Sequence, residues 1–187
     1  PGGGTGEGGR DAHYPFGKYA VYPGGRFNEH MKPFLEGAMD LPGKTRQCAA
    51  VMPYYTISWD QDEAYHENVG NAFSRYIIKD LLREKYGYDG VVCTDWFIVQ
   101  DMIPTVGGFF AGGRCHGVET MDFSERILTC MLNGVDQFGG HDHLNHLKDA
   151  YNLGCSKYGE ASMRTLIERS ARRILTNLFR LGLFDHP

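Results

Sequence analysis

The sequence lacks several features by which whole classes of protein are recognised. Its 187 residues contain no apolar stretch near the ~18 residues that a membrane-spanning helix needs, and its first residues show no signal peptide. It has no Lys/Arg-rich run, and 19 basic residues face 23 acidic ones, which argues against nucleic acid or another polyanion as a partner. The five cysteines are dispersed without a CxxC pair, so a disulfide scaffold or a zinc ribbon is not expected.

What is present is typical of a folded protein. Apolar residues make up 42% and charged residues 22%, and the length suits about one domain. Glycine is abundant and clusters in residues 1–25, which have no periodic apolar pattern and are expected to form a long loop. Because no element precedes this loop to anchor it, we expect the chain to be a piece of a longer protein.

A strand, a loop and a helix are expected to follow one another three times. Short apolar runs predict strands at 48–52, 90–94 and 134–138, and helical spacing of apolar residues predicts helices at 27–39, 70–85, 124–133, 144–151 and 162–181. Long loops after strands are typical of an α/β protein. Three such units cannot close an eight-stranded barrel, which needs roughly 250 residues. The pattern therefore predicts one incomplete domain, a partial (β/α)8 TIM-type barrel.

Chemistry in such folds gathers at the carboxyl ends of the strands. Three segments qualify, namely 52–55, 94–96 and 136–140. Asp95 ends a strand and is followed at once by Trp96, so a carboxylate would lie beside an aromatic ring. Sugars, with one apolar face and many hydroxyls, suit that combination. The alternative is that Asp95 only caps a helix or pairs with an arginine.

Several motifs resemble those of family 3 glycoside hydrolases, the β-glucosidase and β-xylosidase group. Residues 87–96, Gly-Tyr-Asp-Gly-Val-Val-Cys-Thr-Asp-Trp, are similar to the nucleophile signature of the family. Residues 1–4 resemble the continuation of its Lys-His-Phe-Pro-Gly motif, and residues 52–55 resemble its Met-x-x-Tyr segment. Residues 179–185 resemble the stretch that ends its barrel. The motifs occur in the family's order and cover nearly the whole chain.

The resemblance implies a fold, an activity and partners. Residues 1–187 would form the carboxyl-terminal part of the barrel domain, with its last three strand-loop-helix units. The activity would be retaining hydrolysis of terminal β-D-glycosides, with Asp95 as the nucleophile, Trp96 and Tyr55 shaping the sugar pocket, and no cofactor. A β-linked oligosaccharide or glycoside would be the substrate, while the rest of the barrel and a second domain bearing the acid/base glutamate would complete the site. Periplasmic or secreted location is favoured, with a cytoplasmic one left open.

Three further residues are expected to line the substrate pocket. Asp11 and His13 fall where the β-N-acetylglucosaminidases of the family carry an Asp-x-His dyad whose histidine is the acid/base, although the loop around them differs here. We assign Asp11 and His13 to substrate binding, with ordering of their own loop as the alternative. Glu119 and Asp136 are other carboxylates near strand ends, suited equally to substrate contact or to loop support.

Other readings of the sequence stay open. The chain would be a non-catalytic carbohydrate-binding or scaffold fragment if its loops bind without turnover. A metal-dependent hydrolase could be built on His141, His143 and His146, since a transition metal accepts such nitrogens. Residues 4–9 fit GxGxxG formally, but no strand precedes them and no helix follows, so a nucleotide site is not expected.

Overall fold

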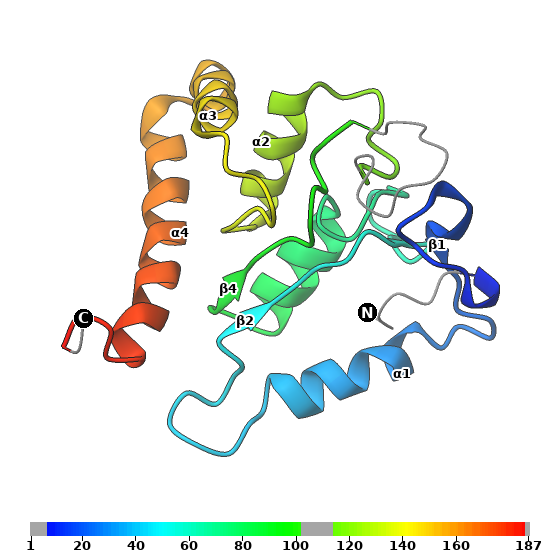
Figure 1. The fold of residues 1–187 in the computed structure, drawn as a ribbon. Helices are drawn as coiled ribbons and strands as arrows, with labels where there is room; N and C mark the ends of the chain where they lie inside the picture. The colour runs from blue at the N-terminus through cyan, green and yellow to red at the C-terminus, as the bar shows by residue number, and fades with distance from the viewer. Residues whose placement is uncertain (1–6, 102–113, 186–187) are drawn as a thin grey trace.

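A computed structural model describes residues 7–101 and 114–185 of the chain. The elements in chain order are the 3₁₀ helices η1 (Glu7–Gly9) and η2 (Pro15–Gly17), strand β1 (Tyr19–Ala20), helix α1 (Phe27–Lys32), π-helix η3 (Pro33–Ala38), strands β2 (Ala50–Val51) and β3 (Ile57–Ser58), π-helix η4 (Arg75–Lys85), strand β4 (Val91–Val92), and helices α2 (Phe123–Asn133), α3 (Leu144–Tyr158) and α4 (Glu160–Arg180). Figure 1 shows β2 and β4 side by side at the centre, with helices around them.

The strands form two parallel pairs. β1 pairs with β3, and β2 pairs with β4 so that Ala50 lies opposite Val91. Beyond β4 the ladder continues as one parallel bridge between Cys93 and Gln137. β2, β4 and the segment around Gln137 therefore run in the same direction, and their carboxyl ends meet at one edge.

Local sequence explains where the helices begin and end. The side chain of Asp122 accepts a hydrogen bond from Glu125 N and that of Glu125 accepts one from Asp122 N, so a capping box starts α2. Gly134, at φ 106°, ends it in the left-handed region that favours glycine. The helix expected from residue 70 begins only at η4, because Ser74 is extended and its hydroxyl caps Ile77 N.

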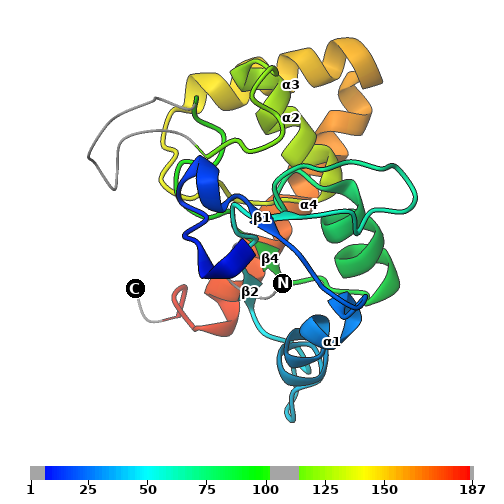
Figure 2. The same cartoon turned by 90° about the vertical axis from the view of Figure 1, so that its right-hand side faces the viewer.

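The helices pack around the parallel strands. α2 contacts α3 and η4, and α4 contacts α3 and β4. In the turned view of Figure 2, α3 and α2 lie above the strands and α1 lies below them. One core runs through the molecule; its largest buried apolar side chains are Tyr55, Phe73, Ile78, Tyr88, Val92, Ile98, Val99, Ile127 and Met163.

The outer side of α4 differs from the face that the sequence predicts. The expected helix at 162–181 has Leu166, Ala171, Ile174, Leu175 and Leu178 as its apolar positions, but Met163 is the fully buried residue of α4. Leu175 is 43% exposed and Phe179 is 61% exposed. Leu166, Ile174 and Leu178 are half-buried, so the predicted face is covered only in part; among the helices and strands of the described chain, α3 and β4 pack most against α4.

The predicted strands at 48–52 and 90–94 contain β2 and β4, and the fold is mixed α/β as expected. The third predicted strand makes a single bridge instead of a ladder. β1 and β3 lie inside segments expected to be loops, which corrects that expectation. The motif of residues 1–4 and the first half of the GxGxxG match, residues 4–6, lie outside the described residues. Within residues 7–101 and 114–185, no helix has the length and apolar character needed to cross a membrane.

Candidate active site

The candidate site lies where the three parallel segments end. Thr94 N donates to Gln137 O at 3.0 Å, and Asp95 N donates to Pro53 O at 3.3 Å, so each neighbouring segment binds the end of β4. The Thr94 hydroxyl accepts from Gly139 N and donates to Asp95 O, both at 3.0 Å. Because Thr94 is buried, these bonds fix the backbone of Asp95 at the edge of the sheet.

Asp95 is a half-buried carboxylate beside an exposed aromatic ring. Its Oδ1 accepts a hydrogen bond from Trp96 N at 2.6 Å, while the Trp96 side chain is 54% exposed. Phe97 N donates to Gly139 O at 3.1 Å and keeps the two strand-end loops together. A Cβ at Gly140 would lie 2.6 Å from Trp96 Nε1, so glycine makes room for the indole. The predicted pairing of a carboxylate with an aromatic plate is thus present at the strand end.

Tyr55 lies beneath Asp95 and Trp96. Its side chain is 1% exposed, and its hydroxyl donates to Trp96 O at 2.7 Å. Burial raises the pKa of Tyr55, and the charge of the nearby Asp95 carboxylate raises it further. Tyr55 is therefore a neutral phenol across the physiological pH range, and it holds the backbone that follows Asp95.

Asp11 and His13 form a hydrogen-bonded pair. Asp11 Oδ1 lies 2.6 Å from His13 Nδ1 and also accepts from His13 N at 2.9 Å. The bond from the His13 backbone is the main cause of the lowered pKa of Asp11. Because a carboxylate only accepts hydrogen bonds, the proton of the pair lies on Nδ1, and Nε2 is the basic nitrogen of the neutral ring.

Tyr54 joins this pair to the strand end. Its hydroxyl lies 3.0 Å from His13 Nδ1, and its ring centroid is 4.8 Å from that of Tyr55. Burial raises the pKa of Tyr54 to about 12, and the charges of Asp11 and Asp95 contribute in that order. Both carboxylates are thus close enough to Tyr54 to affect its titration. The His13 and Tyr55 ring centroids are 5.1 Å apart. Asp11, His13 and Asp95 therefore all lie near Tyr54 and Tyr55.

Two residues that sequence reasoning missed complete the cluster. The Arg114 side chain is buried, with its guanidinium 5.1 Å from the Tyr55 ring centroid. Its charge lowers the pKa of Asp11 and opposes the upward shift of Tyr54 and Tyr55. His116 is fully buried and its Nε2 lies 3.2 Å from Ala12 O, which ties the Asp11–His13 turn to the core. No motif marks either residue, and Tyr54 was only a member of the segment that singled out Tyr55.

The other two predicted carboxylates have different surroundings. Glu119 Oε1 lies 3.9 Å from Lys18 Nζ. Burial lowers the pKa of His116, and the charge of Glu119 opposes this lowering without outweighing it. Asp136 is fully buried and pairs with Arg83 at 2.6 Å and with Arg173 at 3.2 Å. Asp136 Oδ2 also accepts from Val92 N at 3.0 Å. Asp136 therefore ties β4 to Arg83 and to α4.

The three histidines predicted as possible metal ligands lie together, with two rings stacked and the His143 ring edge-on to both. The His141 and His146 ring centroids are 5.2 Å apart and nearly parallel, and the Phe123 ring lies 4.5 Å from His146. Burial lowers the pKa of His141, and the charges of His146 and His143 add to this effect. In the described ranges, no group of three histidine, cysteine, aspartate or glutamate side chains is arranged to hold a metal ion.

Curated proteins align with the whole chain. A probable β-glucosidase C of Aspergillus oryzae is 35% identical over 187 residues, which cover 100% of this chain and 27% of that protein. A periplasmic β-glucosidase/β-xylosidase of Dickeya chrysanthemi is 35% identical over 195 residues, covering 98% of this chain and 28% of that protein. The chain resembles β-glucosidases along its whole length. It spans just over a quarter of the length of these relatives, and the resemblance to family 3 glycoside hydrolases is confirmed.

Solved structures match the fold of the β-glucosidase-like chain. A glycoside hydrolase family 3 β-N-acetylglucosaminidase from Paenibacillus sp. str. FPU-7 superposes with a TM-score of 0.57 at 22% identity, covering 92% of this chain and 28% of that one. A β-glucoside phosphorylase superposes with a TM-score of 0.59 at 18% identity, covering 95% and 29%. At these identities the matches establish the fold alone. No family model matches the chain.

Proposed function

We propose that the protein carrying this chain hydrolyses terminal β-D-glycosides with retention, and that Asp95 is its nucleophile. The observation that carries the proposal is the Asp95 carboxylate, fixed at the end of β4 with Trp96 exposed beside it and Tyr55 buried below. The β-glucosidase names of the relatives support the same class of reaction. Glucose, xylose and N-acetylglucosamine remain alternatives for the sugar.

The proposed reaction has two steps. A carboxylate oxygen of Asp95 attacks the anomeric carbon and forms a glycosyl ester, while an acid donates a proton to the departing oxygen. The group that donated this proton then acts as a base and removes a proton from water. The water oxygen attacks the anomeric carbon and releases the Asp95 carboxylate. Since Oδ1 accepts from Trp96 N, we assign the attack to Oδ2.

The remaining groups have proposed roles around this centre. Trp96 stacks on a sugar ring, and the Tyr55 hydroxyl keeps the Asp95–Trp96 backbone in place. Asp11 and His13 contact the substrate, and Glu119 either contacts it or supports the loop through Lys18. Residues 1–187 serve as the carboxyl-terminal part of a barrel domain, and a glutamate of a following domain supplies the acid/base. An exported location also stays a proposal, since "periplasmic" belongs to the name of the Dickeya relative.

Covalent labelling tests the proposal against the non-catalytic alternative. A 2-fluoroglycoside with a good leaving group traps the glycosyl ester of a retaining enzyme. The fluorine slows both steps, but the good leaving group restores the rate of the first step, so the ester accumulates. We expect mass spectrometry of peptides from the complete protein to find one adduct, on Asp95. A protein that binds the sugar but carries no adduct would be a carbohydrate-binding module, and an adduct on another carboxylate would remove Asp95 from its role.

A second candidate assigns the acid/base to His13 within this chain. The observation that favours it is the 2.6 Å contact between Asp11 Oδ1 and His13 Nδ1, which leaves Nε2 as the basic nitrogen. The pair also lies next to Tyr54, whose pKa is raised in part by the charge of Asp95. This arrangement is the one expected of a histidine that transfers protons with an aspartate behind it. The two candidates differ in whether the chain holds its own proton donor.

Leaving groups of different basicity separate the two candidates. A dinitrophenyl glycoside needs little protonation, whereas an alkyl glycoside depends on an acid that is typically worth about 100- to 10,000-fold. With the acid/base outside residues 1–187, we expect the isolated chain to show any residual activity on the dinitrophenyl glycoside alone. Robust alkyl glycoside hydrolysis by the isolated chain, lost in His13→Gln, would establish the second candidate instead.

A further inference from the structure

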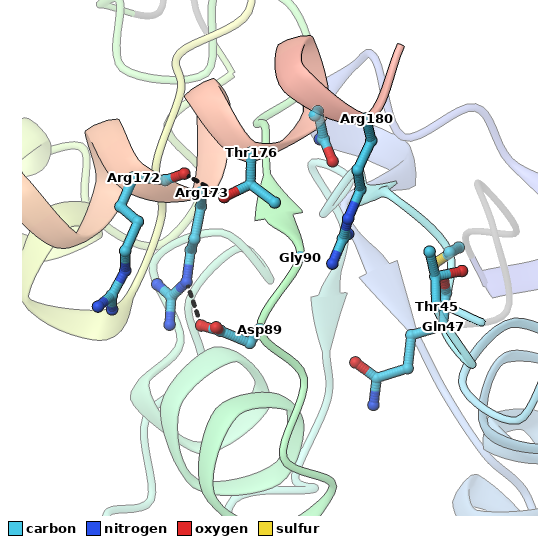
Figure 3. A pocket seen from close by; sticks show the side chains of 10 residues that line it. Thr45, Gln47, Asp89, Gly90, Arg172, Arg173, Thr176 and Arg180 are labelled. Atoms are coloured by element: carbon cyan, nitrogen blue, oxygen red, sulfur yellow. Dashed lines mark hydrogen bonds and ion pairs between the residues drawn. The ribbon is translucent and has the colours of Figure 1, made fainter. Parts of the chain in front are cut away.

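Arginines gather on one side of α4 although the protein as a whole carries a net charge of -4. A hollow of about 400 Å³ lies against this helix. We call it the arginine pocket, and define it by the side chains that give it its charge and polarity: Thr45, Gln47, Asp89, Arg172, Arg173 and Arg180. Figure 3 shows Arg173 and Arg180 extending from α4 toward the start of β4, with Thr45 and Gln47 on the opposite side.

The arginine pocket lies at the other end of the strands from Asp95. Asp89 immediately precedes Gly90 and β4, and Thr45 and Gln47 precede β2, so the pocket borders the amino ends of both strands. Asn177 Nδ2 donates to Ala49 O at 3.1 Å and holds α4 against this edge. The pocket is therefore distinct from the strand-end site proposed for glycoside hydrolysis.

The charges of the pocket do not balance. Arg173 donates to Asp89 Oδ1 at 2.7 Å and to Asp136 Oδ1 at 3.2 Å. Although burial raises the pKa of Asp89, the hydrogen bond and charge of Arg173 outweigh this, and the pKa is lowered overall. Asp89 is thus neutralised by Arg173. Among residues 7–101 and 114–185, neither Arg172 nor Arg180 forms an ion pair, so three arginines face one aspartate and the pocket carries a net positive charge.

A further arginine lies next to the pocket without lining it. Arg169 lies one turn before Arg173 on α4, and its Nε and Nη2 atoms are buried without a hydrogen-bond partner in the described part of the chain. Burial lowers the pKa of Arg169 and the charge of Arg173 lowers it further, while the charges of Asp136 and Asp89 oppose this lowering. Buried donors without acceptors are costly, and a nearby negative charge would offset that cost.

We infer that the arginine pocket binds an oxyanion, the phosphate or carboxylate group of a small ligand. Guanidinium groups match the geometry of such oxygens and form charge-assisted hydrogen bonds with them. Arg172 and Arg180 supply the positive charge that Asp89 does not neutralise, and the Gln47 side-chain amide supplies a neutral donor. This inference does not rest on the proposed glycosidase activity, since the pocket and Asp95 lie at opposite ends of the strands.

Calorimetric titration of the complete protein tests the inference with two probes, inorganic phosphate and citrate, at constant ionic strength. We expect saturable binding of at least one probe to a single site, and a dissociation constant raised about tenfold or more in the double variant Arg172→Gln/Arg180→Gln, because each charge-assisted bond contributes substantially. Arg164→Gln is the matched control, since Arg164 is exposed on the same helix as Arg172 and Arg180 but lies outside the pocket and pairs with Glu168 at 2.7 Å. Circular dichroism checks that all variants are folded.

Each outcome bears on the inference. Binding of phosphate but not citrate, or the reverse, supports it and identifies which oxyanion the pocket takes. The inference is overturned if neither probe binds saturably in the millimolar range, or if the double variant binds as the parent does. It is also overturned if Arg164→Gln weakens binding equally, which would indicate general screening of charge. A probe that competes with a glycoside and loses its site in Asp95→Asn would lie at the strand ends instead.

Discussion

The strand-end site and the outer side of α4 differ in how their side chains are held. At the strand ends, Tyr55, Thr94 and Arg114 are buried, and hydrogen bonds from several segments converge on Asp95. Along the end of α4, Phe179 is 61% exposed and Leu181 is 73% exposed. The first region obtains its geometry from contacts within the chain, whereas the second presents apolar surface of the kind that other protein surfaces cover.

The difference teaches which statements about the molecule depend on this chain alone. The position of Asp95 follows from hydrogen bonds that residues of the chain provide on both sides of β4. The apolar side of α4 is consistent with the proposal that further parts of a barrel pack there, as expected of a chain that spans just over a quarter of its relatives. Variants matched between the two regions can break or sharpen this comparison.

The largest effect on stability is expected at Arg83. Its guanidinium is almost buried, donates to Gly134 O and Tyr88 O, and pairs with the fully buried Asp136. Arg83→Ala would leave buried acceptors and part of a buried charge without compensation. We expect the free energy of unfolding to fall by about 3–5 kcal/mol, measured by urea denaturation.

The control for Arg83→Ala is Arg164→Ala on α4. Arg164 forms an ion pair with Glu168 at 2.7 Å in which both side chains are mostly exposed, and solvent screens such a pair. We expect its midpoint of urea denaturation to stay close to that of the parent. Equal losses of unfolding free energy in the two variants would contradict the contrast between the buried ion pair beside β4 and the exposed ion pair on α4.

A smaller effect is expected at Trp96. Its ring is more than half exposed at the strand end, so Trp96→Ala should remove stacking against the sugar while leaving the core unchanged. We expect a rise in KM and a fall in kcat/KM equivalent to ~1 to 3 kcal/mol of lost interaction, measured with an aryl β-glucoside. Phe179→Ala removes an aromatic ring of similar exposure from α4 and should leave both constants unchanged. Unchanged kinetics in Trp96→Ala would mean that Trp96 only packs on Gly140.

The sequence predicted the parts of the site that are local. The Thr94-Asp95-Trp96 segment lies directly after an apolar strand, so its place at the sheet edge follows from the pattern. Arg114 could not be found in this way, because it reaches the Tyr55 ring only through the tertiary fold. β1 and β3 were missed because β1 lies in the glycine-rich segment 1–25, and only the tertiary fold brings Tyr19 opposite Ile57. The face of α4 was misjudged because burial depends on which elements cover the helix, and spacing does not reveal them.

The most direct test of the central claim compares Asp95→Asn with Asp142→Asn in the complete protein. Both changes convert a carboxylate near a strand end to an amide of the same shape, but the Asp142 side chain is 92% exposed and lies beside His143 rather than Trp96. We predict that Asp95→Asn folds normally and hydrolyses an aryl β-glucoside several orders of magnitude more slowly, because an amide cannot form the glycosyl ester. Asp142→Asn should retain the parent rate. A near-normal rate in Asp95→Asn would contradict the assignment of Asp95 as the nucleophile.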